Sequence, residues 1–280
     1  MAAQADHVRI DHAALAPYAR TLPATSPPPP DLEAAGDEAR AAFILQLNAV
    51  NFGSGWFPTL AKPPGLSGFR TVEAGLRRRG PWTADELQAL TPHAVADTLG
   101  QDPEHPLMAL FATHLNALGA RVDGSFKAFA QAHESPEALA TELASWDTWH
   151  DVSPHPTGDV PFFKRAQIAA ADLALAGLIP NAGLERLTLF ADNLVPHVLR
   201  IDGVLHFAPG LVARIDREAL IEHDSPEEVE IRACALRAVE LLVQAHGNTT
   251  ATAVDNALWH RGAAPRYKAH PRHRARTTAY

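Results

Sequence analysis

Helix-start signals recur along the whole chain, whereas segments that alternate apolar and polar residues, as strands do, are nearly absent. Thr83 opens a capping-box pattern with Glu86, and Ser135 and Ser225 each stand directly before a proline and a glutamate. A serine N-cap with proline at the first helical position is typical of a helix start. The pattern therefore predicts an all-α fold.

Further helices are expected over residues 35–47 and 162–176, and the helix after Ser225 is expected to carry an apolar face over residues 229–245. The best candidate for strand structure is the stretch 198–207, where Asp202 and Gly203 form a hairpin-turn signal, although its flanks also fit short helices.

Prolines that interrupt regular structure occur in the N-terminal part of the chain at Pro23 and at residues 27–30. This run is expected to be extended, because proline fixes φ and lacks the backbone donor. No internal repeat occurs, so the sequence predicts an N-terminal extension over residues 1–30 and one helical domain over residues 31–280.

Composition and charge restrict the class of protein. With 280 residues, 46% of them hydrophobic, the chain can bury one sizeable core or two small ones. No apolar run is long enough to span a membrane, and Asp6, Arg9 and Asp11 stand where a signal peptide would be apolar. Cys234 is the only cysteine, so no intrachain disulfide can form. We therefore expect a cytoplasmic protein without a membrane partner.

The net charge of −8 is unevenly spread. Residues 261–280 hold six basic residues and no acid, so the first 260 residues carry 18 Lys and Arg against 32 Asp and Glu, a net charge of −14. The acidic body favours a small anionic ligand over stable contact with nucleic acid. The basic segment is expected to fold back onto the body, with Arg274 and Arg276 facing one carboxylate cluster or one phosphate and with Tyr280 buried.

Motifs for metals and common cofactors are missing from the sequence. Its fifteen histidines show no HExxH spacing, and His150 and His155 near Asp151 and Asp159 are a weak metal signal without cysteine. No phosphate-binding or dinucleotide-binding glycine motif occurs. We therefore expect no metal and no cofactor, and we expect Cys234 to be buried and unreactive.

Three local segments could carry chemistry. Residues 48–58 place glycines with Asn51, Phe52 and Trp56 at a helix end, which suits either close contact with a flat base or a capped helix with aromatics in the core. Lys164 begins a helix after two phenylalanines, where it could bind phosphate or form a solvated turn. Asp192 follows an apolar run, so it is either functional or the cap of the next helix.

Read together and in order, these motifs resemble the queuosine salvage proteins, the queuosine 5'-phosphate N-glycosylase/hydrolase family. The resemblance spans residues 40–280 and rests on Asn51-Phe52, residues 164–168, residues 190–192 with 195–196, residues 230–233, residues 255–259, residues 273–276 and Tyr280. It implies an all-helical fold related to the helix-hairpin-helix DNA glycosylases. It also implies hydrolysis of queuosine 5'-monophosphate to release queuine.

The resemblance also implies a set of site residues. Asp192 would be the catalytic carboxylate, Lys164 would hold the 5'-phosphate, and Asp255 or His260 would protonate the leaving base. Phe52, Trp56 and Phe190 would bracket the base. The full set of expected substrate-binding residues is Asn51, Phe52, Trp56, Lys164, Phe190, Ala191, Asn193, Asp255, Trp259 and His260.

Departures from the family pattern at residues 53–56, at residues 193–194 and at His260 leave the exact base open. One alternative is a sister enzyme that cuts another modified nucleoside or nucleotide. A second is a non-catalytic protein that binds tRNA or a deazapurine through the basic segment. A third is a DNA glycosylase, which the lack of a basic stripe with an intercalating wedge disfavours.

Overall fold

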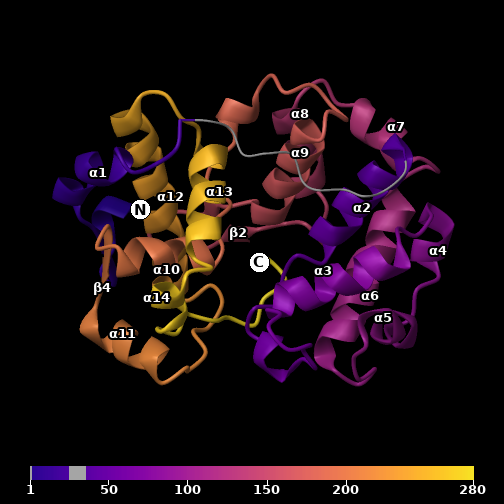
Figure 1. Cartoon of the computed structure of the whole chain (residues 1–280), viewed down its shortest axis with the longest axis horizontal. Coiled ribbons are helices and arrows are strands. Elements are labelled where there is room, and N and C mark those ends of the chain that lie inside the picture. Colours follow the sequence, from indigo (N-terminus) through magenta and orange to yellow (C-terminus); the bar gives the residue numbers. More distant parts are fainter. Residues whose placement is uncertain (1, 25–35) are drawn as a thin grey trace.

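Helices dominate the structure, a computed structural model that describes residues 2–24 and 36–280 (Figure 1). The proline run at residues 27–30, expected to be extended, lies outside the described residues. The α-helices are α1 (His12–Ala19), α2 (Asp37–Ala49), α3 (Gly68–Arg79), α4 (Ala84–Gln88), α5 (Pro92–Leu99), α6 (Pro106–Arg121), α7 (Phe126–Gln131), α8 (Pro136–Ala144), α9 (Lys164–Leu175), α10 (Leu194–Ile201), α11 (Pro209–Asp216), α12 (Pro226–His246), α13 (Ala251–Arg261) and α14 (Pro265–Lys268). The short strands are β1 (Val8–Ile10), β2 (Val152–Ser153), β3 (Val160–Pro161) and β4 (Leu205–Phe207). The expected mostly helical fold is confirmed.

The predicted helix starts are confirmed in atomic detail. The Ser135 and Ser225 hydroxyls accept the backbone N–H groups three residues ahead, at 3.2 and 3.3 Å. Thr83 and Glu86 form the reciprocal capping box at the start of α4. These side chains satisfy N–H groups that have no partner inside the helix, which is why the sequence alone locates the helix starts.

The predicted hairpin over residues 198–207 is wrong. Its first half is the end of α10, and Gly203 adopts a positive φ of 79° in the turn that follows. The second half is β4, which pairs antiparallel with β1, so that Arg9 faces His206. The alternative of a short helix holds for the first half, because α10 continues to Ile201 and its residues 195–199 are all buried.

The N-terminal residues 2–24 are packed against the helical body. Besides the pairing of β1 with β4, α1 packs against α12. The Glu230 carboxylate on α12 accepts the backbone N–H groups of Asp6, His7 and Val8, at 3.0, 2.6 and 3.1 Å.

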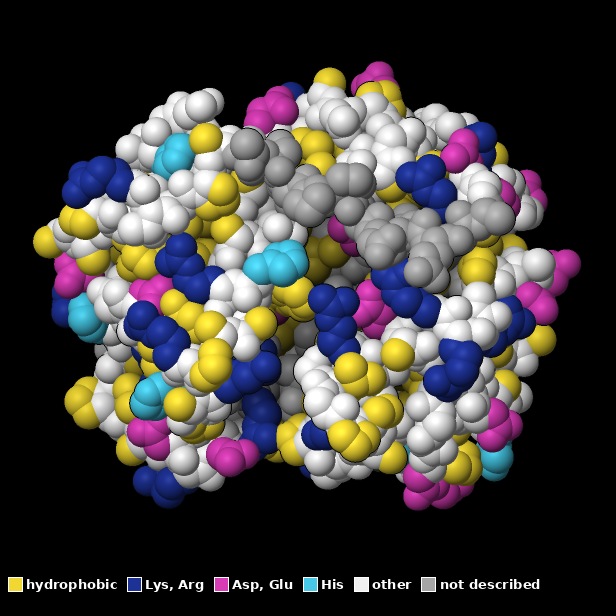
Figure 2. All heavy atoms as spheres, viewed as in Figure 1, with side chains coloured by type: hydrophobic (Ala, Val, Ile, Leu, Met, Phe, Trp, Pro, Cys, Tyr) yellow, Lys and Arg dark blue, Asp and Glu magenta, His cyan; other side chains and the backbone are white. Residues whose placement is uncertain are grey.

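Two large hydrophobic clusters and a small one form the core of the described residues. One large cluster is formed by residues of α2 to α9, and the other by residues of α1, α10 to α13 and the strands β1 and β4. The small cluster consists of Ala275, Ala279 and Tyr280. In Figure 1 the two groups of helices lie side by side, and the chain ends between them. Figure 2 shows that this face is hollowed between the half that carries α13 and the half that carries α3. In the described residues, no helix combines the length and the apolar character that crossing a membrane requires.

Candidate active site

Asp192 lies just before α10, whose N-cap residue is Asn193, and its side chain binds the first N–H groups of the helix. Its Oδ1 accepts the backbone N–H groups of Leu194 at 2.7 Å and Val195 at 3.1 Å. Its Oδ2 makes no hydrogen bond within the part of the chain that the structure describes, and the side chain is half-buried. The capping and functional interpretations are thus compatible, because one oxygen caps the helix and the other stays available.

Asp255 is a second acid beside Asp192. It lies on α13, is 9% exposed, and its Oδ1 has no hydrogen-bond partner among the described residues. Burial, together with the charge of Asp192, raises the pKa of Asp255 well above its usual range. A carboxyl whose protonated form is favoured by burial is suited to donate a proton.

Lys164, the first residue of α9, lies among these acids. Its backbone N–H donates to Asp151 Oδ2 at 3.0 Å, and its Nζ donates to the carbonyl of Asn51 at 2.8 Å. Burial lowers the pKa of Lys164 to about 8, although the negative charge of Asp192 opposes that shift. The ammonium group is therefore placed to stabilise the ionised form of Asp192.

Asp172 belongs to the same charged group and was not expected from the sequence. It lies on α9 eight residues after Lys164, so both side chains occupy one face of the helix. Its Oδ2 accepts from Asn48 Nδ2 at 3.1 Å, and burial raises the pKa of its carboxyl to about 6. The spacing from Lys164 is the only sequence signal that could have identified it.

The expected aromatic residues differ in exposure. Phe52 is 1% exposed, and its ring packs 5.1 Å from Phe111 within the first hydrophobic cluster. Phe190 is also buried, whereas Trp56 and Trp259 are half-buried. Trp259 reaches from α13 to α3, where its ring lies 6.3 Å from Phe69. Of this set, Trp56 and Trp259 keep the most surface for a ligand.

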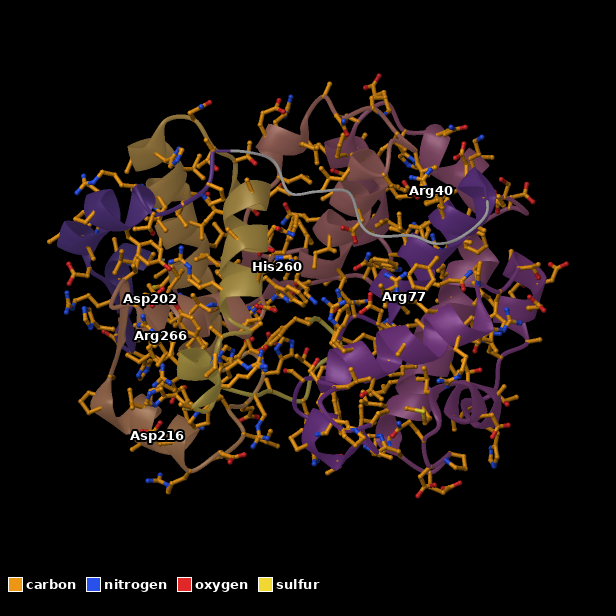
Figure 3. The ribbon with its side chains drawn as sticks, viewed as in Figure 1. Arg40, Arg77, Asp202, Asp216, His260 and Arg266 are labelled. Carbon is orange, nitrogen blue, oxygen red and sulfur yellow. The ribbon has the colours of Figure 1, made fainter. Side chains whose placement is uncertain are left out.

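Three other expected residues contribute in different ways. The Ala191 carbonyl accepts from Arg232 Nε at 2.9 Å, and the Asn193 amide donates to the His273 carbonyl at 3.1 Å. His260 is exposed on α13, and its Nδ1 lies 2.8 Å from the carbonyl of Asn256, one turn back (Figure 3). Burial and proximity to Asp192 thus favour Asp255 over His260 as the proton donor.

The C-terminal segment, residues 271–280, folds back onto the body as predicted. His273, Ala275 and Tyr280 are buried, and Gly55 lies so close to the Ala275 carbonyl that any side chain there would clash with it. The expectation that Arg274 and Arg276 hold one common group is wrong. Arg274 pairs with Glu218 at 3.0 Å, and the Arg276 guanidinium lies 5.9 Å from the centre of the Trp56 ring.

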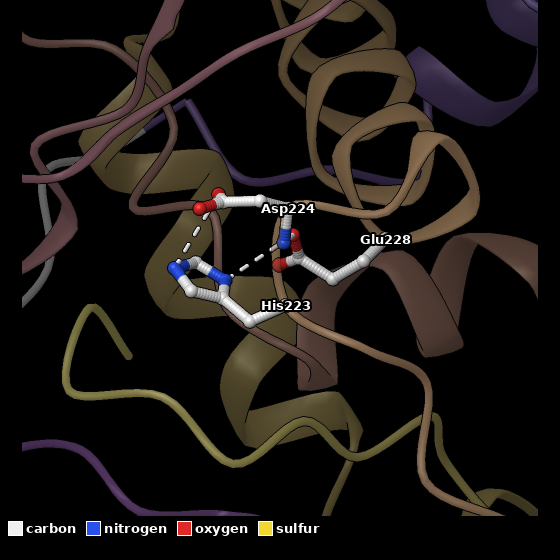
Figure 4. A group of neighbouring side chains, drawn as sticks. All are labelled: His223, Asp224 and Glu228. Atoms are coloured by element: carbon white, nitrogen blue, oxygen red, sulfur yellow. Dashed lines mark hydrogen bonds and ion pairs between the residues drawn. The ribbon is translucent and has the colours of Figure 1, made fainter.

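One histidine and two carboxylates gather where α12 begins, with one possible ligand atom of each within 4.8 Å of the others. Asp224 faces Nε2 of His223 and Glu228 faces Nδ1, each at 3.4 Å, so the imidazole bridges the two acids (Figure 4). The Arg232 guanidinium lies 3.8 Å from Glu228 and supplies a positive charge of its own. Although burial opposes it, hydrogen bonding to Glu228 raises the pKa of His223. These surroundings favour the protonated imidazole, whereas a metal ion would bind the neutral form.

Away from these residues, an open cavity of about 1400 Å³ lies between the N-terminal segment and α12. None of the expected site residues lines it. One of its acids, Asp11, caps α1 and pairs with His206 at 3.2 Å.

The chain is similar to several known proteins that share the same name. The family model described as queuosine salvage protein matches residues 32–280. A protein of Sphaerobacter thermophilus named queuosine 5'-phosphate N-glycosylase/hydrolase is 35% identical over 304 aligned positions, which cover 99% of this chain and 94% of the relative. Proteins of the same name from Dictyostelium discoideum and Schizosaccharomyces pombe are 28% and 32% identical, over 87% and 42% of this chain and 79% and 36% of the relatives.

Proposed function

Because the chain belongs to the queuosine salvage protein family, we propose that it hydrolyses the N-glycosidic bond of queuosine 5'-monophosphate, or of a related 7-deazaguanine nucleotide, and releases the free base. The observation that carries this proposal is the pair of the half-buried Asp192 and the buried Asp255 with Lys164 beside it. The hollow between the two groups of helices would receive the substrate. The related fold would be that of the helix-hairpin-helix DNA glycosylases, and the salvage reaction would take place in the cytoplasm.

The proposed reaction breaks the bond between C1' of the ribose and the nitrogen of the base. As that bond lengthens, positive charge builds on the ribose ring, and ionised Asp192 stabilises it. Water then adds to C1' and gives its proton to Asp192, while Asp255 gives its own proton to the departing base. The step requires Asp192 without a proton and Asp255 with one, and burial favours the protonated form of Asp255.

The ligand is proposed to be a small nucleotide rather than tRNA. The acidic body, with a net charge of −14 over its first 260 residues, repels long polyanions. The basic C-terminal segment, which could have bound RNA, packs against the rest of the protein instead. Ala275 and Tyr280 are buried, and Arg274 is paired with Glu218.

The direct test is incubation of the purified protein with queuosine 5'-monophosphate and detection of released base by liquid chromatography and mass spectrometry. Release of queuine, with no release of guanine from guanosine 5'-monophosphate, supports the proposal. Binding of the nucleotide without release would identify a binding protein. Release from another modified nucleotide alone would identify a sister glycosylase.

Lys164→Ala is expected to raise KM for the 5'-monophosphate by roughly 10- to 100-fold, the range for one lost hydrogen bond to a charged group. The matching nucleoside, which has no phosphate, should show a much smaller change. Steady-state kinetics on the two substrates make the comparison, with Lys127→Ala as the control because Lys127 pairs with Asp37 on the surface. An equal change in KM for both substrates would show that Lys164 acts only through Asp192 and does not bind the phosphate.

The rate is expected to fall on the basic side of the pH profile. Asp255 must be protonated and Lys164 charged, and the pKa of Lys164 is about 8, so kcat should decline as pH rises through that value. The Asp255→Asn variant has no carboxyl proton to lose, so its kcat should be low. The part of the decline in kcat that comes from deprotonation of Asp255 should be missing from its pH profile. A kcat that is flat from pH 6 to pH 10 in the unaltered protein would contradict the assignment of both groups.

A further inference from the structure

Arg232 is a fully buried cation in the middle of α12 that the proposed chemistry does not use. It is 0% exposed, and its guanidinium lies between two aromatic rings, 3.9 Å from the centre of Phe162 and 4.4 Å from that of Tyr280. A buried cation is costly unless acids and hydrogen bonds compensate it. Asp151 at 2.7 Å and Glu228 at 3.8 Å provide that compensation.

The hydrogen bonds of Arg232 connect it to the segment that carries Asp192 and to the segment that carries Lys164. Its Nε donates to the carbonyl of Ala191, the residue before Asp192, at 2.9 Å. Its Nη2 donates to Asp151 Oδ2, the same oxygen that accepts the backbone N–H of Lys164. One side chain thus fixes the peptide that carries Asp192 and the helix start that carries Lys164.

Tyr280, in the C-terminal segment, contacts Arg232 and the segment beside Lys164. Its ring covers one face of the Arg232 guanidinium, and its carbonyl accepts the backbone N–H of Gly53 at 3.1 Å. Two residues before Gly53, the carbonyl of Asn51 accepts from Lys164 Nζ at 2.8 Å. Tyr280 therefore contacts Arg232, which binds the carboxylate that accepts the Lys164 backbone N–H, and also the segment that accepts from the Lys164 ammonium group.

We propose that Arg232 and Tyr280 are positioning residues that hold Asp192 and Lys164 in the mutual geometry that the reaction needs. The assignment rests on the proposed function for its effect on rate. Its effect on Lys164 does not depend on that function. A misplacement of about 1 Å in such a pair is enough to lower a rate by roughly 100-fold.

The surroundings of Lys164 provide a readout that a merely structural role would leave unchanged. The charged groups that act on it are Asp192, Asp151 and Asp255, which favour its ammonium form, and Arg165, which opposes it. Burial outweighs them and lowers its pKa to about 8. Loss of the Tyr280 ring should admit water beside Arg232 and move the pKa of Lys164 back toward its ordinary value of 10.5.

The experiment compares Tyr280→Ala with Tyr280→Phe, which keeps the ring over Arg232. The chain has only four lysines, Lys62, Lys127, Lys164 and Lys268, so each can be followed by NMR of protein labelled at lysine, with Lys164→Arg to assign the signal. Tyr280→Ala should raise the titration midpoint of Lys164 and lower kcat by roughly 10- to 100-fold, with KM changed less than about threefold. Tyr280→Phe should restore both values. Glu218→Gln, which removes the charge of the surface pair with Arg274, is the matched control and should leave both unchanged.

Two results would overturn the proposal. The first is a Tyr280→Ala protein that melts at a lower temperature but keeps the titration of Lys164 and kcat of the unaltered chain. The second is a Tyr280→Phe protein that behaves like Tyr280→Ala, which would assign the effect to the hydroxyl. If Tyr280→Ala does not fold, Arg232→Lys replaces it, because a lysine cannot bind Ala191 and Asp151 as the guanidinium does. A shifted Lys164 in a protein that releases no base from any nucleotide would reject the proposed function and leave the positioning role standing.

Discussion

Asp192→Asn is expected to lower kcat by about a thousandfold or more while the protein stays folded. The amide oxygen of asparagine can still accept the N–H groups of Leu194 and Val195, so the cap of α10 is retained. What is lost is the negative charge, which in the proposed mechanism stabilises the ribose cation and takes the proton of water. Ligand binding should change far less than turnover. Single-turnover rates and the thermal melting curve measure the two effects separately.

Asp216→Asn is the matched control for this variant. Asp216 is an exposed carboxylate at the end of α11, away from the hollow between the helix groups (Figure 3). It should keep the rate and the melting temperature of the unaltered protein. Turnover by Asp192→Asn at the rate of the unaltered protein would show that another group is the catalytic carboxylate, and Asp172 would be tested next.

Deletion of residues 271–280 is expected to lower both stability and activity. It removes the buried Tyr280, His273 and Ala275 and leaves one face of Arg232 without its aromatic cover. Loss of one large buried aromatic alone costs about 3–5 kcal/mol. A loss of this size lowers the melting temperature by roughly 6–20 °C in a protein somewhat smaller than this one. The loss of kcat/KM should accompany it, because Gly53 loses the carbonyl that holds its segment beside Lys164.

Thermal melting and kcat/KM of the shortened chain test this prediction together. Glu218→Gln again serves as the control, because it weakens only a surface ion pair, worth at most about 1 kcal/mol. A shortened protein with an unchanged melting temperature and an unchanged kcat/KM would show that the segment contributes neither to the fold nor to the site.

The proposed acid–base pair, Asp192 and Asp255, shows how much of the site could be predicted from the sequence. Asp192 and Asp255 were expected from their motifs, and the structure brings them together from α10 and α13. Asp172 was missed because only its spacing from Lys164 on α9 marks it in the sequence. Its importance comes from burial and from the charges of Glu73 and Asp255, which lie on other helices. Lys164 was expected at a phosphate, and only the fold reveals that it also lies beside Asp192.

The sequence by itself determined the helical class and the starts of α4, α8 and α12. These depend on contacts between residues three positions apart, which any local window contains. It did not determine the pairing of β4, since its partner β1 lies almost 200 residues away in the chain. Only the tertiary structure decided the role of Arg232, a motif residue without an assigned purpose. Its partners Asp151, Ala191 and Tyr280 are distant in sequence and meet it because a buried guanidinium must find acids, carbonyls and ring faces wherever the fold supplies them.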